Sequence, residues 1–150
     1  MVDRQTHAID DQVRTNVALY LKANVQPGQS VVSESAAYIG LYGNVKLYDY
    51  PGLTSTTSVH ALQSLPPRQR DMPHLIASVR ADWLLLRPWE LELLQAEPPD
   101  VAVQYQGAKV FELAGVPEGA LDRGAQIGFA GYQVYDLDMK FTVLKRTSAQ

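Results

Sequence analysis

Residues 47–55, LYDYPGLTS, place a carboxylate and several hydroxyl groups just after a predicted strand. Asp49 lies near the carboxyl end of residues 45–50, whose large apolar side chains alternate with polar ones. Open α/β sheets bind ligands at this edge, where a carboxylate accepts hydrogen bonds from a sugar or acts as a base. The alternative, which we favour, is that Asp49 only holds the following Pro-Gly turn through backbone N–H groups.

A second hypothesis joins Asp49 to His60, which follows the hydroxyl-rich loop that begins at Thr54. With Ser55 or Ser58 as nucleophile, the three side chains would form the arrangement of a serine hydrolase. The sequence contains no G-x-S-x-G elbow to expose such a serine. A small stand-alone hydrolase is therefore the reading that the residues favour least, and we assign no catalytic residue.

Metal and cofactor chemistry has little support in the residue types. The chain has no cysteine, and its three histidines form no H-x-x-x-H pair. Five of the ten glycines fall in residues 115–131, but neither a dinucleotide-binding nor a P-loop pattern occurs there. We predict a partner-contacting or mobile loop over 115–131, no metal site and no cofactor.

Two further groups of residues have both a ligand-binding and a structural explanation. Asp136 and Asp138 flank Leu137 and would point the same way in an extended chain, but a hairpin turn uses the same residues, and we prefer it. Aromatic residues suggest a groove for a sugar ring, although such residues more often fill a core or face another domain. The aromatic set is Tyr38, Tyr42, Tyr48, Tyr50, Trp83 and Trp89.

The elements that position these residues follow from hydrophobic periodicity and from turn signals. An apolar residue at nearly every fourth position predicts a helix over about 8–25, which Pro27 and Gly28 end. Further helices are expected at 36–41, capped by Ser33 or Ser35, and at 58–65, about 70–80 and 89–95. Strands are expected at 30–34, 45–50, 82–87, 101–105 and 109–113, with a closing hairpin of 132–135 and 140–144.

This order predicts a single α/β domain over residues 1–150. We expect a layered sandwich with a central mixed sheet, parallel at first because helices join the early strands, and with an antiparallel edge hairpin. An apolar content of 46% suits one sizeable core. The net charge of −3 argues against nucleic acid as a partner. No apolar run approaches the ~20 residues of a membrane span, so we expect the chain itself to be soluble.

Two segments are similar to a region of known membrane enzymes. They are VALYLKANVQPGQSVVSESAAYIGLYGNVKLYDYPGLTS and LIASVRADWLLL. They resemble the soluble C-terminal region of polytopic membrane glycosyltransferases that use polyprenyl-phosphate sugars, the protein-mannosyltransferase and aminoarabinose-transferase group. Asp49, Gly52, Leu53, Thr54 and Ser55 match a D-x-x-G-L-[TV]-[ST] element, and Arg80, Asp82, Trp83 and Leu84 match a later R-P-D-Y-[LV] element. Ala81 replaces the usual proline, and Ala36 and Ala37 stand where glycine is common.

The resemblance covers roughly residues 12–86 and implies a role without chemistry. In those enzymes the catalytic carboxylates lie on extracytoplasmic loops between membrane helices, so none is carried over to this chain. The resemblance implies an extracytoplasmic domain that helps to place acceptor or sugar, with the membrane domain of the same parent protein and a glycan acceptor as partners. The weak candidates for substrate contact are Asp49, Gly52, Thr54, Ser55, His60 and Tyr42. The alternative function is a carbohydrate-binding module.

Overall fold

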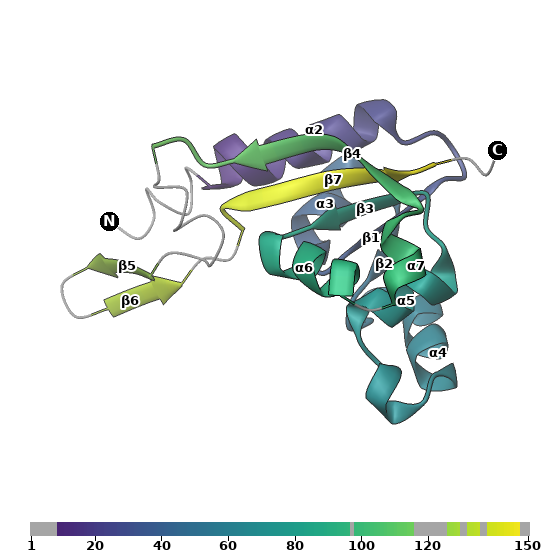
Figure 1. Ribbon diagram of the computed structural model, residues 1–150. Helices are drawn as coiled ribbons and strands as arrows, with labels where there is room; N and C mark the ends of the chain where they lie inside the picture. Colours follow the sequence, from purple (N-terminus) through teal and green to yellow (C-terminus); the bar gives the residue numbers. More distant parts are fainter. Residues whose placement is uncertain (1–8, 97, 116–125, 130–131, 136–137, 148–150) are drawn as a thin grey trace.

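The computed structural model describes residues 9–96, 98–115, 126–129, 132–135 and 138–147. Its centre is a five-stranded sheet of order β2-β1-β3-β7-β4 (Figure 1). The first three strands in that order are parallel, and the β3-β7 and β7-β4 pairs are antiparallel. The strands are β1 (Ser30–Ser33), β2 (Lys46–Asp49), β3 (Trp83–Leu86), β4 (Tyr105–Glu112) and β7 (Lys140–Arg146). The predicted α/β class and mixed sheet are confirmed.

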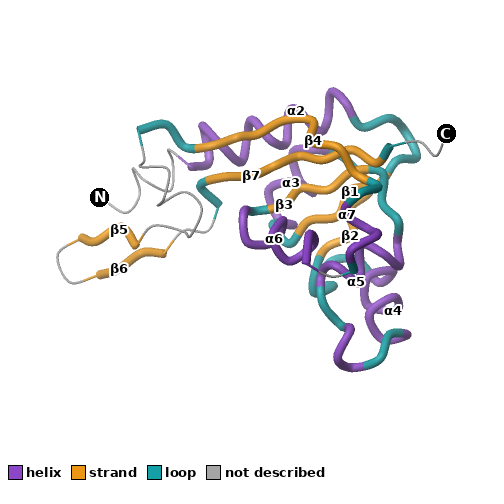
Figure 2. Tube along the Cα trace, viewed as in Figure 1, coloured by secondary structure: helices purple, strands orange, loops and turns teal. Residues whose placement is uncertain are grey.

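Helices cover both faces of this sheet (Figure 2). One face packs against the N-terminal π-helical segment η1 (Asp10–Arg14), α2 (Thr15–Asn24) and α3 (Ala36–Gly43). The other face packs against α5 (Met72–Val79), α6 (Pro88–Ala96) and α7 (Pro99–Ala102). Along the sequence, α4 (Thr56–Ser64) and the short 3-10 helix η2 (Pro67–Gln69) come after β2 and before α5.

The strand β3 shows why the sheet is buried between two helical layers. All four of its side chains are buried, and successive ones point to opposite faces. Leu85 joins the core beneath α2 and α3, whereas Leu84 and Leu86 join the core beneath α5 and α6. A continuous apolar run is what a strand covered on both faces requires.

Short-range signals set the ends of several helices. Asp71 accepts a hydrogen bond from the backbone N–H of His74 and caps α5, whose first turn holds Pro73. Ser55 caps α4 in the same way through the N–H of Ser58. Asn44 ends α3 in the left-handed conformation that asparagine tolerates. The helices predicted at 8–25, 36–41, 58–65, about 70–80 and 89–95 all have counterparts in the structure.

The strand predicted at 101–105 is wrong. Pro99 to Ala102 form a short helix, because Pro98 and Pro99 favour the first turn of a helix and Val101 then packs into the core. The two strands expected around Gln106-Gly107 are a single strand, β4, with a register shift between Gly107 and Lys109. The Gly that suggested a turn therefore marks a bulge.

The prediction that residues 132–135 and 140–144 pair as a closing hairpin is also wrong. β6 (Tyr132–Tyr135) pairs with β5 (Gln126–Phe129) in a separate two-stranded ribbon. β7 lies between β3 and β4, where it supplies the partner that the buried edge of β3 needs. Residues 126–129, which we predicted as loop, form the strand β5. The rest of the predicted loop, 116–125 and 130–131, and residues 136–137 of the predicted turn lie outside the described residues.

Among the residues that the structure describes, none of the helices combines the length and the apolar character of a membrane span.

Candidate functional site

The carboxyl ends of β1 and β3 meet where an open α/β sheet usually binds its ligand. The connection that leaves β1 leads to β2, on one side of β1, whereas β3 pairs with the other side of β1. The chain connections therefore run in opposite directions from the gap between β1 and β3, which is a topological switch point. Glu34 follows β1 directly, and Arg87 follows β3 directly. These two side chains form an ion pair across the divergence point.

Arg87 is the centre of a buried network that fills this place. Its side chain is 8% exposed. The guanidinium donates through Nε to Asp138 Oδ1 at 2.7 Å and through Nη1 to Glu90 Oε1 at 3.2 Å. The backbone N–H of Arg87 donates to Glu90 Oε2 at 2.7 Å, which also caps the start of α6. The guanidinium centre lies 5.7 Å from the ring centroid of Phe141, a cation–π distance.

Asp138 links this network to the N-terminal helix. Its Oδ2 accepts from Arg14 Nε at 2.8 Å and from the hydroxyl of Ser35 at 3.1 Å. Arg14 also pairs with Asp10 one helical turn earlier, at 2.8 Å. Asp10 and Arg14 bound the π-helical segment, in which the N–H of Thr15 bonds Asp10 O, and such segments are frequent at functional sites. Asp138 therefore ties η1, the β1–α3 loop and the β3–α6 junction together.

The pKa values of the two buried carboxylates in this network are shifted in opposite directions. Burial raises the pKa of Glu90, and its bonds to Arg87 only partly offset this effect. Burial also acts to raise the pKa of Asp138, but the charges of Arg87 and Arg14 outweigh it and hold that pKa below its usual range. The described members are four carboxylates and two guanidinium groups: Asp10, Glu34, Glu90, Asp138, Arg14 and Arg87. When all of these described members are ionised, their summed charge is negative.

The loop after β2 brings together four of the six residues proposed for substrate contact. Asp49 is 1% exposed, and its carboxylate accepts from Leu53 N at 2.5 Å, from Thr54 N at 3.1 Å and from Thr54 Oγ1 at 2.9 Å. Burial raises the pKa of Asp49, yet these hydrogen bonds outweigh burial and lower it. The carboxylate is thus committed to the turn, which is the interpretation that we favoured from the sequence.

Gly52 and Ser55 have structural tasks in the same loop. Gly52 has a φ of +98°, and a Cβ at this position would stand 2.8 Å from Val59 Cγ2. The hydroxyl of Ser55 accepts from the N–H of Ser58 and is the cap of α4. The turn alone explains why position 52 is glycine and position 55 is serine. Contact between this loop and a substrate stays a prediction.

His60 and Tyr42 form no hydrogen bond with the Asp49 turn within the described residues. His60 is exposed on α4, and no hydrogen bond joins it to Asp49 in the described part of the chain. Ser58 Oγ is buried and has no hydrogen-bond partner among the described residues. No described hydrogen bond links His60 to Asp49 or to a serine hydroxyl, and the hydrolase hypothesis stays a prediction. Tyr42 is 49% exposed on α3, where its ring lies 5.1 Å from that of Tyr38.

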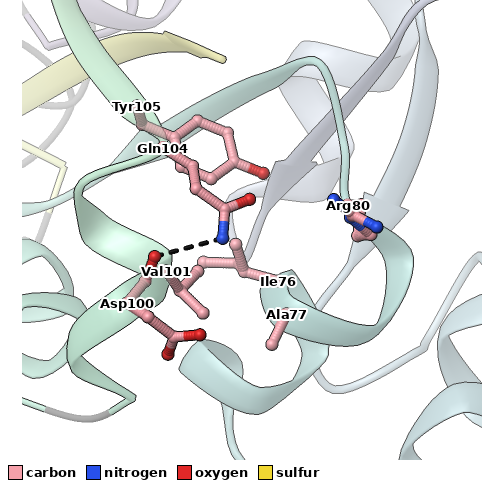
Figure 3. A pocket seen from close by; sticks show the side chains of 7 residues that line it. All are labelled: Ile76, Ala77, Arg80, Asp100, Val101, Gln104 and Tyr105. Carbon is pink, nitrogen blue, oxygen red and sulfur yellow. Dashed lines mark hydrogen bonds between the residues drawn. The ribbon is translucent and has the colours of Figure 1, made fainter. Parts of the chain in front are cut away.

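A separate hollow of about 280 Å³ lies between α5, α7 and the start of β4 (Figure 3). Asp100, Gln104 and Arg80 supply its polar groups, and the ring of Tyr105 forms part of its wall. The hydroxyl of Tyr105 donates to Ala81 O at 2.8 Å, and burial raises its pKa to about 12. Tyr105 thus offers its ring, and not its hydroxyl, to a ligand.

Sequence reasoning missed the importance of Arg87, Glu90, Arg14 and Asp138. Arg87 and Glu90 were detectable in principle, because a charged residue ends the strongest apolar run and an acid follows three positions later. The local pattern around Asp138 predicts a hairpin turn, whereas its two arginine partners lie 51 and 124 residues away. Within the described residues, no group of three or more His, Cys, Asp or Glu side chains is placed to hold a metal ion.

Comparison with known protein families gives a match over most of the chain. The model of a family described as Domain of unknown function (DUF8728) matches residues 5–138. No curated protein and no solved structure matches the chain significantly.

Proposed function

We propose that this chain, which belongs to the DUF8728 family, is an extracytoplasmic accessory domain of a membrane glycosyltransferase. In this proposal it transfers no sugar by itself. It helps to position the acceptor or the sugar donor for a membrane domain of the same parent protein.

The observation that carries the proposal is where the resembling residues lie in the fold. Residues 12–86 comprise α2, β1, α3, β2, α4, α5 and β3. They form the parallel half of the sheet with the helices that connect it, which is one contiguous structural unit. A similarity confined to such a unit supports a shared fold better than scattered matches would.

The two short motifs within that unit have structural tasks, which supports a role without chemistry. The Asp49 carboxylate is occupied by the loop that follows it. In the second motif, Asp82 accepts from the N–H of Ser30 at 2.9 Å and pairs with Arg146 at 3.4 Å, so it fastens β3 to its neighbours. Such residues preserve an architecture that presents a surface to another domain.

The first prediction tests the parent protein. Deletion of residues 9–147 from the full open reading frame should lower the rate of sugar transfer by at least about tenfold, because acceptor positioning is lost. Transfer from a polyprenyl-phosphate sugar would be measured in membranes, with expression levels matched by immunoblot. The isolated chain should show no turnover. A reading frame without upstream membrane helices, or catalysis by the isolated chain, would contradict the proposal.

The hollow in Figure 3 favours a second candidate, a carbohydrate-binding module. Its volume of about 280 Å³ is just below the range of small-molecule sites, which span roughly 300–1,000 Å³. A carboxylate, an amide and a guanidinium line it beside an aromatic ring, a combination able to bond sugar hydroxyls.

The second prediction follows from this hollow. In a titration with oligosaccharides, the Tyr105 ring and the Gln104 side-chain amide should show saturable chemical-shift changes. Asp100→Asn keeps the shape of that side chain but converts half of its acceptors to a donor, so it should weaken binding by about tenfold. Glu92→Gln on the exposed side of α6 is the matched control and should bind as the wild type does. Equal shifts in the two variants would exclude this site.

A further inference from the structure

A second hollow lies at the opposite edge of the sheet from the Arg87 network. It encloses about 520 Å³, within the range of roughly 300–1,000 Å³ that is typical of small-molecule sites. Its walls are the C-terminal turn of α2, the turn 25–29, and the junction 43–46 between α3 and β2. These segments meet at the amino end of the parallel strands.

Two lysines stand on different walls of this hollow. Lys22 lies in the last turn of α2, and Lys46 is the first residue of β2. Both are exposed, and neither forms an ion pair with a described residue. The Lys46 ammonium lies 5.3 Å from the ring centroid of Tyr48. A hydrogen bond with Tyr48 raises the pKa of Lys46, so this ammonium is charged at neutral pH. The lining contains no aspartate or glutamate.

Amide groups complete the lining with further donors. Gln29 Oε1 accepts from Trp83 Nε1 at 3.0 Å and from Gln26 N at 2.9 Å. These two bonds fix the orientation of the Gln29 amide and leave its Nε2 group as the remaining donor. Asn44 adds a second side-chain amide on the far wall. Gly28 has a φ of +90° and would have no atom within 4 Å of an added Cβ, so the turn stays open beside these groups.

We propose that this hollow binds the phosphate group of a ligand. A phosphate oxygen only accepts hydrogen bonds, and ammonium and amide N–H groups are the donors that match it. Lys22 also complements the carbonyl end of α2, but this local role does not require a second lysine on the opposite wall. The phosphate belongs either to a small phosphorylated molecule or to a lipid headgroup. This inference does not depend on the proposed parent glycosyltransferase.

The third prediction tests the site with inorganic phosphate and with vesicles. In ¹H–¹⁵N spectra of the whole chain, phosphate should cause saturable shifts at Lys22, Gln29 and Lys46. The double variant Lys22→Gln/Lys46→Gln should weaken this binding at least about tenfold, because both charge-assisted bonds are lost. Arg68→Gln/Lys109→Gln removes the same charge from exposed positions outside the hollow and should bind phosphate like the wild type.

Vesicles distinguish the two sources of phosphate. Co-sedimentation with phosphatidylcholine vesicles that contain phosphatidic acid, and not with pure phosphatidylcholine, assigns the site to a lipid headgroup if the Lys22/Lys46 variant fails to sediment. Saturable binding of inorganic phosphate without sedimentation assigns it to a small phosphorylated molecule. The proposal is overturned if neither probe binds, or if the Arg68/Lys109 variant loses binding to the same extent. Melting temperatures of both variants should match the wild type, since all four side chains are exposed.

Discussion

Replacement of Arg87 by methionine should lower the free energy of unfolding by about 3–5 kcal/mol, the usual cost of removing one partner from a buried ion pair. Methionine keeps much of the side-chain length but leaves Asp138 and Glu90 without the guanidinium that both now share. The side chains of Asp138 and Glu90 are only 8% and 7% exposed, so water cannot replace the lost partner. Urea denaturation followed by far-UV circular dichroism measures the change.

A matched control and a double variant separate charge from packing. Arg68→Met removes the same side chain from an exposed turn and should change stability by less than about 0.5 kcal/mol. Adding Glu90→Gln to Arg87→Met removes one of the stranded charges, so the pair should lose less stability than the two single changes predict together. A loss below about 1 kcal/mol for Arg87→Met would show that the network behaves like a surface ion pair.

The pH dependence of stability gives the same variant a second readout. Because the folded protein lowers the pKa of Asp138, its ionised form stabilises the fold above the unfolded pKa near 3.9. That contribution is lost as pH falls through the lower, folded pKa. Arg87→Met removes one of the two charges that lower this pKa, so acid unfolding of the variant should be less steep than that of the wild type. An unchanged acid profile would mean that Arg87 does not set the titration of Asp138.

The parallel half of the fold was predictable because its signals are local. The apolar run at 83–86, the Asp71 cap followed by Pro73, and the Pro27–Gly28 stop each act within a few residues. Helix periodicity and turn chemistry therefore located α2, β1, β2, α5 and β3 without knowledge of their neighbours. The Asp49 turn was predictable for the same reason, since its hydrogen bonds reach only four and five residues along the chain.

The antiparallel half and the charged network depend on contacts that no local pattern contains. β7 is inserted between β3 and β4, although β6 precedes it in sequence and looks like its natural hairpin partner. That insertion carries Asp138 to the ends of β1 and β3, where it meets Arg87 and Arg14. Once Asp138 was assigned to a turn, its partners could not be inferred. A short apolar segment such as 101–105 is equally ambiguous, because one helical turn and one strand bury similar residues.

Replacement of Gly52 by alanine should cost about 2–4 kcal/mol, because backbone strain and steric overlap coincide at this position. The φ of +98° is one that side chains with a Cβ rarely adopt. The added Cβ would stand 2.8 Å from Val59 Cγ2 and 3.3 Å from Val59 N, and the second of these is a backbone atom that a rotamer change cannot move. Thermal and urea unfolding measure the loss, with Gly107→Ala as the control. Gly107 has no atom within 4 Å of an added Cβ, so the control should change stability by less than about 0.5 kcal/mol.

Adding Val59→Ala to Gly52→Ala separates the cost of the side-chain contact from the cost of the backbone contact and the positive φ. It removes the contact at Cγ2 but leaves both the contact at Val59 N and the positive φ, so the double variant should recover only part of the lost stability. Full recovery of stability would show that the backbone at position 52 accepts alanine and that the overlap with Val59 Cγ2 caused the whole loss. Sugar transfer by the proposed parent glycosyltransferase would then test whether the loop only shapes the fold. If Gly52→Ala/Val59→Ala regains stability and sugar transfer together, the Asp49 turn serves the fold. Stability regained without transfer would place the loop from Gly52 to Ser55 in contact with a substrate.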